Sequence, residues 1–146
     1  MIDRFEHFTL SIFSISRYWN IIATEEMKKY GLRGAYALYL LMIASNEGEI
    51  TAAKLAEVCR RDKADVSRAL SRFQEKGIIQ PYGNSRYRVA PILTSEGRQL
   101  AEQIRKRAGI VLEQAGQGIS EEMRENMYRS LDIIASNMRE ICENDF

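Results

Sequence analysis

Residues 50–80 read ITAAKLAEVCRRDKADVSRALSRFQEKGIIQ, and this stretch decides the fold. Thr51 is a suitable N-cap for a short helix over Ala52–Cys59, and Asp62 is one for a second helix over Lys63–Lys76. The apolar stripe of the second helix consists of Val66, Ala69, Leu70 and Phe73. The pattern therefore predicts two short helices that are joined by a tight turn.

The hydrophobic period changes from helical to alternating at Ile78. Turn-forming residues Gly83-Asn84-Ser85 separate residues 79–82 from residues 86–93, which predicts a β-hairpin. Pro91 removes one ladder donor from the second strand and favours an edge or a bulge there. Two short helices followed by a hairpin is the order of a winged helix-turn-helix, a fold that can place its second helix in a major groove of DNA.

Charge is distributed unevenly along the chain of 146 residues. The formal net charge is only +1, yet residues 54–88 hold nine Lys or Arg against four Asp or Glu, a net charge of +5. The basic segment thus coincides with the predicted winged helix-turn-helix, which favours a polyanionic partner.

Helical geometry places one face of the second helix opposite its buried stripe. Arg68 there can bridge the two acceptors of a guanine, Ser67 and Ser71 can bind bases or phosphates, and Ala64 can pack on a thymine methyl. The predicted DNA-binding residues are Lys54, Lys63, Ala64, Ser67, Arg68, Ser71, Arg72, Arg86 and Arg88. Lys54, Lys63 and Arg72 are the predicted phosphate contacts.

The rest of the chain predicts helices. One runs to about Tyr30, a largely apolar one covers Gly34–Ser45, one starts at Thr94 or Ser95, and a last one starts at Ser120. The first and last carry apolar stripes that need a covering surface. The predicted dimer contacts are Phe5, Phe8, Ile12, Met127, Leu131, Ile134 and Met138. We expect a mainly α protein with a small hairpin wing.

The stretch from Ile50 together with LTSEGRQL, at residues 93–100, resembles the multiple-antibiotic-resistance regulator (MarR) family. The resemblance implies a bacterial, homodimeric transcriptional regulator, commonly a repressor, that reads a pseudo-palindromic operator. It also implies one domain over residues 1–146, with dimerisation helices in 1–30 and 95–143 and a DNA-binding lobe in 34–93. A small aromatic or lipophilic effector would release the DNA.

Three positions depart from the family pattern. Asn84 stands where the family commonly has an acid two residues before its wing arginine, here Arg86. Arg60 and Arg61 occupy places in the turn that a glycine and an aliphatic residue more often fill. These two arginines add charge close to the edge that would face DNA.

Two further features of the sequence leave alternatives open. An effector pocket could be lined by Trp19, Tyr36 and Tyr39, although aromatic residues at helical spacing are often plain core. The protein could instead be a winged-helix module that binds another protein, since Asp65 and Glu75 on or near the outer face would repel phosphate.

An enzyme is not expected. The only histidine is His7, and there is no glycine-rich phosphate loop, so neither a cofactor nor a metal site is predicted. Cys59 is expected to pack in the core, and Cys142 to be a partly exposed thiol or an interface residue. Two cysteines and no export or membrane-spanning signal favour a cytoplasmic protein.

Overall fold

The structure is a computed structural model that describes residues 3–81 and 89–146. Within these ranges the helices are α1 (Arg4–Lys28), α2 (Tyr36–Ser45), α3 (Ala52–Cys59), α4 (Lys63–Glu75), α5 (Ser95–Ala115) and α6 (Glu121–Asp145). The chain forms two compact units, Met1–Lys106 and Arg107–Phe146. None of the helices in the described ranges is both long and apolar enough to cross a membrane.

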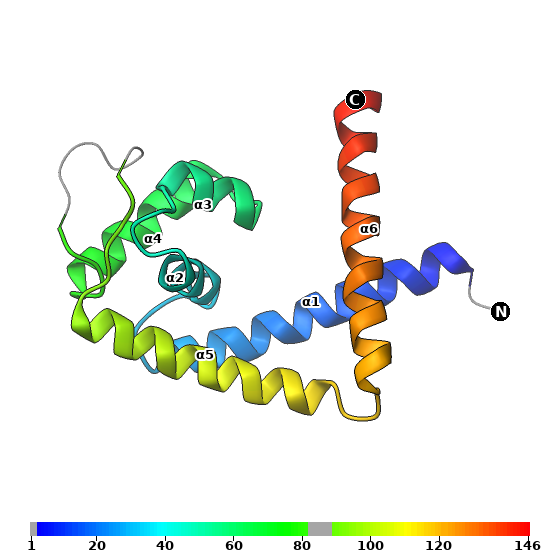
Figure 1. Cartoon of the computed structure of the whole chain (residues 1–146), viewed down its shortest axis with the longest axis horizontal. Coiled ribbons are helices and arrows are strands. Elements are labelled where there is room, and N and C mark those ends of the chain that lie inside the picture. Colours follow the sequence, from blue (N-terminus) through cyan, green and yellow to red (C-terminus); the bar gives the residue numbers. More distant parts are fainter. Residues whose placement is uncertain (1–2, 82–88) are drawn as a thin grey trace. The chain divides into compact units, whose positions relative to one another are not determined.

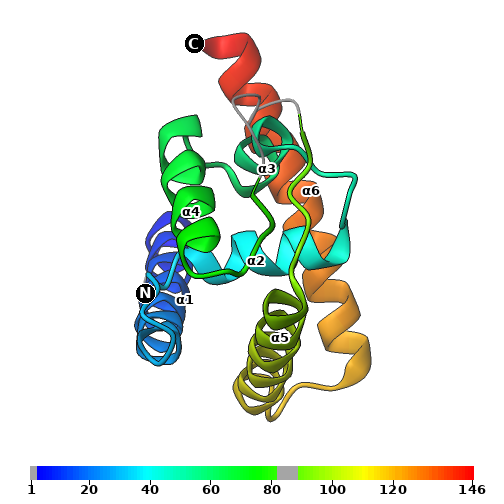
Figure 2. The same cartoon turned by 90° about the vertical axis from the view of Figure 1, so that its left-hand side faces the viewer.

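In the first unit, α2 is the central helix. It contacts α1, α3 and α4, and both Figure 1 and Figure 2 show it lying against the pair formed by α3 and α4. Tyr36, Tyr39, Leu40 and Ile43 are its buried residues. Burial on most sides is what a largely apolar helix favours, and among its large apolar side chains Leu38 is the exposed exception.

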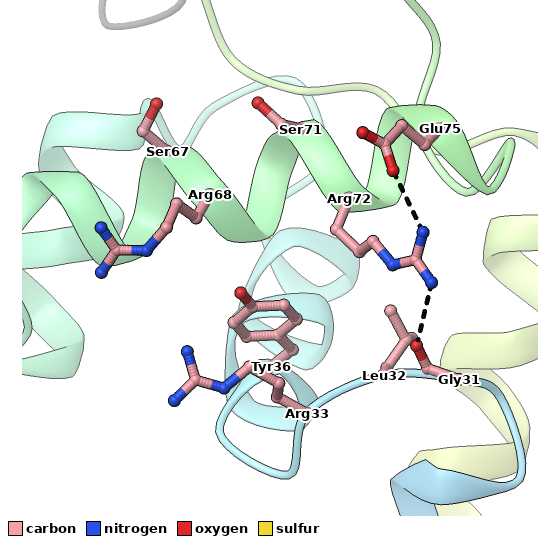
Figure 3. A pocket seen from close by; sticks show the side chains of 9 residues that line it. All are labelled: Gly31, Leu32, Arg33, Tyr36, Ser67, Arg68, Ser71, Arg72 and Glu75. Atoms are coloured by element: carbon pink, nitrogen blue, oxygen red, sulfur yellow. Dashed lines mark hydrogen bonds and ion pairs between the residues drawn. The ribbon is translucent and has the colours of Figure 1, made fainter.

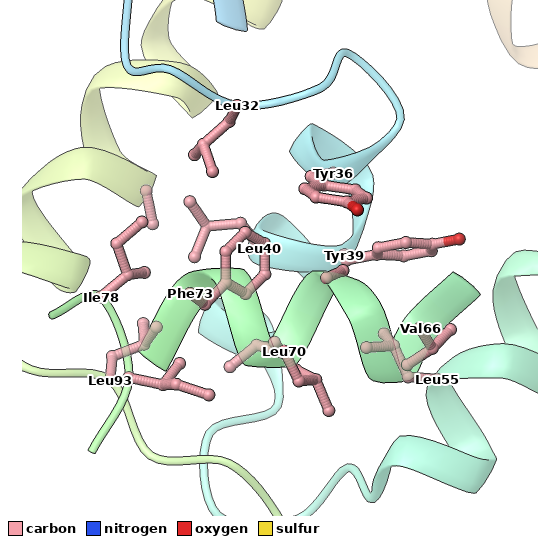
Figure 4. Packing of buried hydrophobic residues seen from close by; sticks show 14 of the residues in the cluster. Leu32, Tyr36, Tyr39, Leu40, Leu55, Val66, Leu70, Phe73, Ile78 and Leu93 are labelled. Carbon is pink, nitrogen blue, oxygen red and sulfur yellow. The ribbon is translucent and has the colours of Figure 1, made fainter. Parts of the chain in front are cut away.

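The core lies between α2 and α4. Figure 4 shows Val66, Leu70 and Phe73 of α4 packed among buried side chains from the neighbouring elements. The ring of Phe73 meets that of Tyr36 edge to face, with centroids 5.8 Å apart. The predicted apolar stripe of α4 is therefore confirmed as its buried face.

Capping fixes the helix boundaries in the basic segment. Lys54 donates its backbone N–H to the Thr51 hydroxyl, and Asp65 donates its own to the Asp62 carboxylate at 2.7 Å. Both predicted N-caps are confirmed. The helix α3 ends in a left-handed residue, Arg60, and the next residue donates its N–H back to Ala56 O.

The base of the predicted wing is only partly described, because residues 82–88 lie outside the described ranges. In the described part, Ile79 and Leu93 form an antiparallel bridge, and Gln80 N donates to Ile92 O at 2.8 Å. No strand is assigned within residues 3–81 and 89–146, so the hairpin stays a prediction. Thr94 follows this bridge directly and caps α5, because its hydroxyl accepts the N–H of Gly97.

The second unit contains the C-terminal part of α5 and the whole of α6. Gly118, with φ +94°, lies in the connection, and the Ser120 hydroxyl accepts the N–H of Met123 as the N-cap of α6. Arg124 pairs with Glu113 across this connection at 3.3 Å. None of the residues of α6 is buried. Its apolar stripe therefore remains uncovered in a single chain.

Candidate nucleic-acid interface

The face of α4 opposite its buried stripe carries small hydroxyl and long cationic side chains in two rows. Figure 3 shows Ser67, Ser71 and Glu75 along one side of the helix, and Arg68 and Arg72 turned toward the segment that precedes α2. The side chains of Arg68 and Arg72 are 60% and 46% exposed. The small serines let another molecule come close to the helix, and the arginines supply hydrogen-bond donors. Both properties suit contact with base edges and phosphates.

The other predicted contacts surround this face. Lys63 and Ala64, in the first turn of α4, are exposed. Lys54 on α3 is also exposed and lies 3.5 Å from Glu57 in a weak surface pair. The predicted wing contacts Arg86 and Arg88 fall in the segment 82–88 and lie outside the described residues.

Both acids that would repel phosphate have cationic partners. Glu75 accepts a hydrogen bond from Arg72 at 3.0 Å. Asp65 turns back from the outer face, and only 17% of its side chain is exposed. Its carboxylate accepts a hydrogen bond from the hydroxyl of Tyr39 and pairs with Arg33 and Arg68. The acids of α4 therefore do not form a surface of uncompensated negative charge.

The environment of Asp65 favours its ionised form. The hydrogen bond from Tyr39 lowers the pKa of Asp65 most, with help from Arg33 and Arg68 and against the opposing effect of burial. Burial, followed by the hydrogen bond to Asp65, raises the pKa of Tyr39. Tyr39 thus stays a neutral donor and Asp65 a charged acceptor at neutral pH.

A pocket of about 400 Å³ opens between residues 31–36 and α4. Its walls include Arg33 and Tyr36 on one side and Arg68, Ser71 and Arg72 on the other (Figure 3). Tyr36 is the predicted effector-pocket residue that lines it. Tyr39 stacks on Tyr36 with centroids 6.0 Å apart, but neither Tyr39 nor Trp19 lines this pocket.

Sequence reasoning missed Arg33. This residue precedes α2 and lies 30 positions before Lys63, the first residue of α4, so neither helical period nor the local charge count connects it with α4. Its guanidinium lies 5.7 Å from the centroid of the Tyr36 ring and 3.7 Å from Asp65. The available signal was a lone arginine beside aromatic residues, which is too common to stand out.

The two cysteines differ in their burial. Cys59 is half-buried against the core, and burial raises the pKa of its thiol, which disfavours the reactive thiolate. Cys142 is exposed near the end of α6. Across residues 3–81 and 89–146, no three His, Cys, Asp or Glu side chains come together as metal ligands could.

The sequence and the fold are both similar to known regulators. A family model described as the MarR family matches residues 30–85. The solved transcriptional regulator SlyA is 26% identical, with a TM-score of 0.80 and coverage of 93% of this chain and 96% of that chain. No match is found among curated proteins.

Two further solved structures share the fold at lower identity. A MarR-family regulator from Listeria monocytogenes, solved with a 26mer DNA, is 24% identical, with a TM-score of 0.80 and coverage of 94% of this chain and 90% of that chain. A MarR regulator from Methanosarcina mazei Go1 is 22% identical, with a TM-score of 0.82 and coverage of 97% and 94%. The likeness extends over nearly the whole length of each chain.

Proposed function

We propose that this chain is a MarR-family, sequence-specific transcriptional regulator that binds double-stranded DNA with α4 in the major groove, as the family model over residues 30–85 and the likeness to SlyA support. The observation that carries the proposal is the division of α4 into two faces. Val66, Ala69, Leu70 and Phe73 are buried, whereas the opposite face presents the two serines and two arginines described above. A single rigid helix thereby holds its contacts in a fixed pattern.

Within this proposal the contacts have different roles. Arg68 reads a guanine through its two acceptors, and Ala64 packs on a thymine methyl. Ser67 and Ser71 bind base edges or phosphates. Lys54, Lys63 and Arg72 bind phosphates, which fixes the register of the helix on the duplex. Arg86 and Arg88 are proposed to extend the contact from a hairpin wing that continues the Ile79–Leu93 bridge.

We propose that the regulator is a homodimer whose dimer body consists of residues 1–30 and 95–143, with the DNA-binding lobe in 34–93. The apolar side chains of α1 and α6 support this. Met27 is the only buried residue of α1, while Phe5, Phe13 and Ile15 are each about two-thirds or more exposed, at 72%, 67% and 67%. Uncovered apolar surface of this extent marks an association surface.

A repressor that a small aromatic or lipophilic effector releases is the form of regulation that we propose. Support comes from the pocket beside α4, which shares Arg68, Ser71 and Arg72 with the proposed DNA face. An occupant there would compete with DNA only to the extent that it binds the DNA-free protein more tightly. A module that binds protein instead of DNA has no further observation in its favour, since Asp65 and Glu75 are paired.

The test compares Arg68→Ala with Lys63→Ala. Loss of a base contact should cost about 1–3 kcal/mol on the selected site and relax the preference at one base pair. Loss of a phosphate contact should weaken binding to all sequences alike and flatten the salt dependence by about one unit. Selection from random duplexes followed by titration at several salt concentrations measures both.

The control for this test is Arg129→Ala, which removes one exposed charge from α6 without touching the proposed interface. It should leave both the base preference and the salt slope unchanged. An Arg68→Ala protein that selects the same sites as the wild type would refute the assignment of Arg68.

A further inference from the structure

We propose that Asp65 is a positioning residue of the DNA interface, which holds Arg33 beside Arg68 so that the segment before α2 forms a second, phosphate-binding edge of that interface. This inference rests on the proposed function and adds to it a contact outside the helix-turn-helix. It also explains why α4, a helix that would bind DNA, carries the acidic residue Asp65.

The two oxygens of Asp65 have separate tasks. Oδ2 accepts the hydrogen bond from the Tyr39 hydroxyl at 2.5 Å. Oδ1 lies 3.5 Å from Nη2 of Arg68 and 3.7 Å from Nη1 of Arg33. One oxygen therefore anchors the carboxylate to the core, and the other lies between two guanidinium groups that come from different elements.

The anchor is rigid. Tyr39 is 1% exposed and stacks on Tyr36, which is itself 5% exposed. Arg33 lies over the ring of that same Tyr36, at 5.7 Å from its centroid. Arg33 thus has a cationic contact with the ring and an ionic contact with the carboxylate, and both supports are fixed to the core.

The pairs with Asp65 leave both arginines able to bind DNA. The side chain of Arg68 is 60% exposed and that of Arg33 is 66% exposed, while that of Asp65 is only 17% exposed. A guanidinium has five N–H donors, so a single contact with a carboxylate leaves most of them for bases or phosphates. Partial ordering before binding reduces the conformational entropy that each arginine loses on the DNA.

The pocket between residues 31–36 and α4 supplies the space. Arg33 is on one of its walls and Arg68 and Arg72 are on the opposite one (Figure 3). A volume of about 400 Å³ easily admits a phosphate group of a DNA strand that passes along α4. Such a phosphate would contact cationic side chains on both walls, whereas α4 alone would provide cationic side chains on one wall only.

The experiment measures affinity for the duplex enriched by selection and for a duplex of shuffled sequence, each over a range of salt. Asp65→Asn keeps the shape and an oxygen that can accept the Tyr39 hydrogen bond but removes the charge. The ratio of specific to nonspecific affinity should fall about tenfold, because Arg68 loses its orientation. Glu57→Gln, which removes one negative charge from exposed α3, is the matched control and should raise both affinities alike.

Arg33→Gln tests the second edge. It should weaken binding to both duplexes and lower the salt slope by about one unit, while Arg129→Gln on α6 should change neither. Tyr39→Phe provides a second route, because it removes the anchor and keeps every charge. It should lower the affinity ratio in the same direction as Asp65→Asn.

The outcomes separate this inference from the proposed function. A wild-type protein with sequence preference, together with an Asp65→Asn variant that behaves like Glu57→Gln, overturns the positioning role alone. An Arg33→Gln variant that behaves like Arg129→Gln overturns the second edge. A folded wild-type protein without any sequence preference overturns the proposed function and this inference with it.

Discussion

Arg60 has a backbone conformation that is costly for a residue with a side chain. It ends α3 with φ 55° and ψ 46°, and it is the one non-glycine residue with positive φ in the described ranges. A side chain in this region costs about 1–2 kcal/mol relative to ordinary backbone. The cation gained at the edge of the helix-turn-helix is thus placed where glycine would be favoured.

We expect Arg60→Gly to raise the free energy of unfolding by about 0.5–1 kcal/mol, since the relief of strain exceeds the added entropy of the unfolded chain. Arg61→Gly removes the same charge one position later, at a residue without positive φ, and should lower that free energy by about 0.5–1 kcal/mol. Urea denaturation of both variants compares them directly. Equal effects would show that the backbone at Arg60 is unstrained.

Asp65 should give the folded protein a characteristic acid response. Its folded pKa lies below the ordinary value, so the ionised carboxylate stabilises the fold above the unfolded pKa of about 3.9. That stabilisation is lost as the pH falls through the folded pKa. The difference in unfolding free energy between the wild type and Asp65→Asn should therefore be constant near neutral pH and shrink below about pH 4. A difference that does not depend on pH would contradict the lowered pKa.

Contacts between side chains of different elements could not be predicted from the sequence. The pattern identified the outward face of α4, but it treated Asp65 as an acid that repels phosphate. The structure shows it bonded to Tyr39, 26 residues earlier in the chain. Periodicity describes which face a residue occupies and carries no information on a partner from another element, which is why Arg33 was missed as well.

Helices were predictable because their signals are local. The bounds Ala52–Cys59 match the structure, the second helix ends at Glu75 instead of Lys76, and Ser120 caps α6 as expected. The helix predicted from Gly34 begins at Tyr36, because Arg33 and Gly34 form a turn with the next residues. A hairpin depends on pairing between distant segments, and its predicted turn lies outside the described residues.

Close packing at the start of α5 gives a prediction at the scale of elements. A Cβ on the buried Gly97 would clash with the backbone oxygen of Ile78, at the base of the predicted wing. Gly97→Ala must therefore push α5 away from this base, and we expect a loss of about 1–3 kcal/mol in unfolding free energy. Thermal unfolding, followed by circular dichroism, measures it.

Gly109→Ala is the matched control on the same helix. A Cβ there meets no atom within 4 Å, so the substitution should stabilise the helix by about 0.5–1 kcal/mol. Stabilisation by both substitutions to a similar degree would mean that helix propensity and not contact with Ile78 decides the effect at Gly97.

At the scale of the whole molecule, the exposed apolar side chains of α1 and α6 favour association with a partner. Leu131, Met127 and Met138 on α6 are 40%, 40% and 53% exposed, and none of the residues of this helix is buried. A second copy of the chain would cover the same surfaces on both partners through a two-fold axis. Two lobes on that axis would place two recognition helices about one turn of DNA apart.

Leu131→Lys tests this arrangement because it places a charge in the middle of the apolar stripe of α6. The wild type should sediment as a dimer, and its unfolding temperature should rise with protein concentration, since association stabilises the folded state by mass action. Leu131→Lys should sediment as a monomer or aggregate and bind the selected duplex far more weakly, because each molecule then offers one α4 instead of two. Ser136→Lys adds the same charge about 140° around the helix from Leu131 and about 160° from Ile134 and Met138, and should leave the dimer intact. If Leu131→Lys remains a dimer with unchanged DNA affinity, the apolar stripe of α6 is not part of the dimer interface.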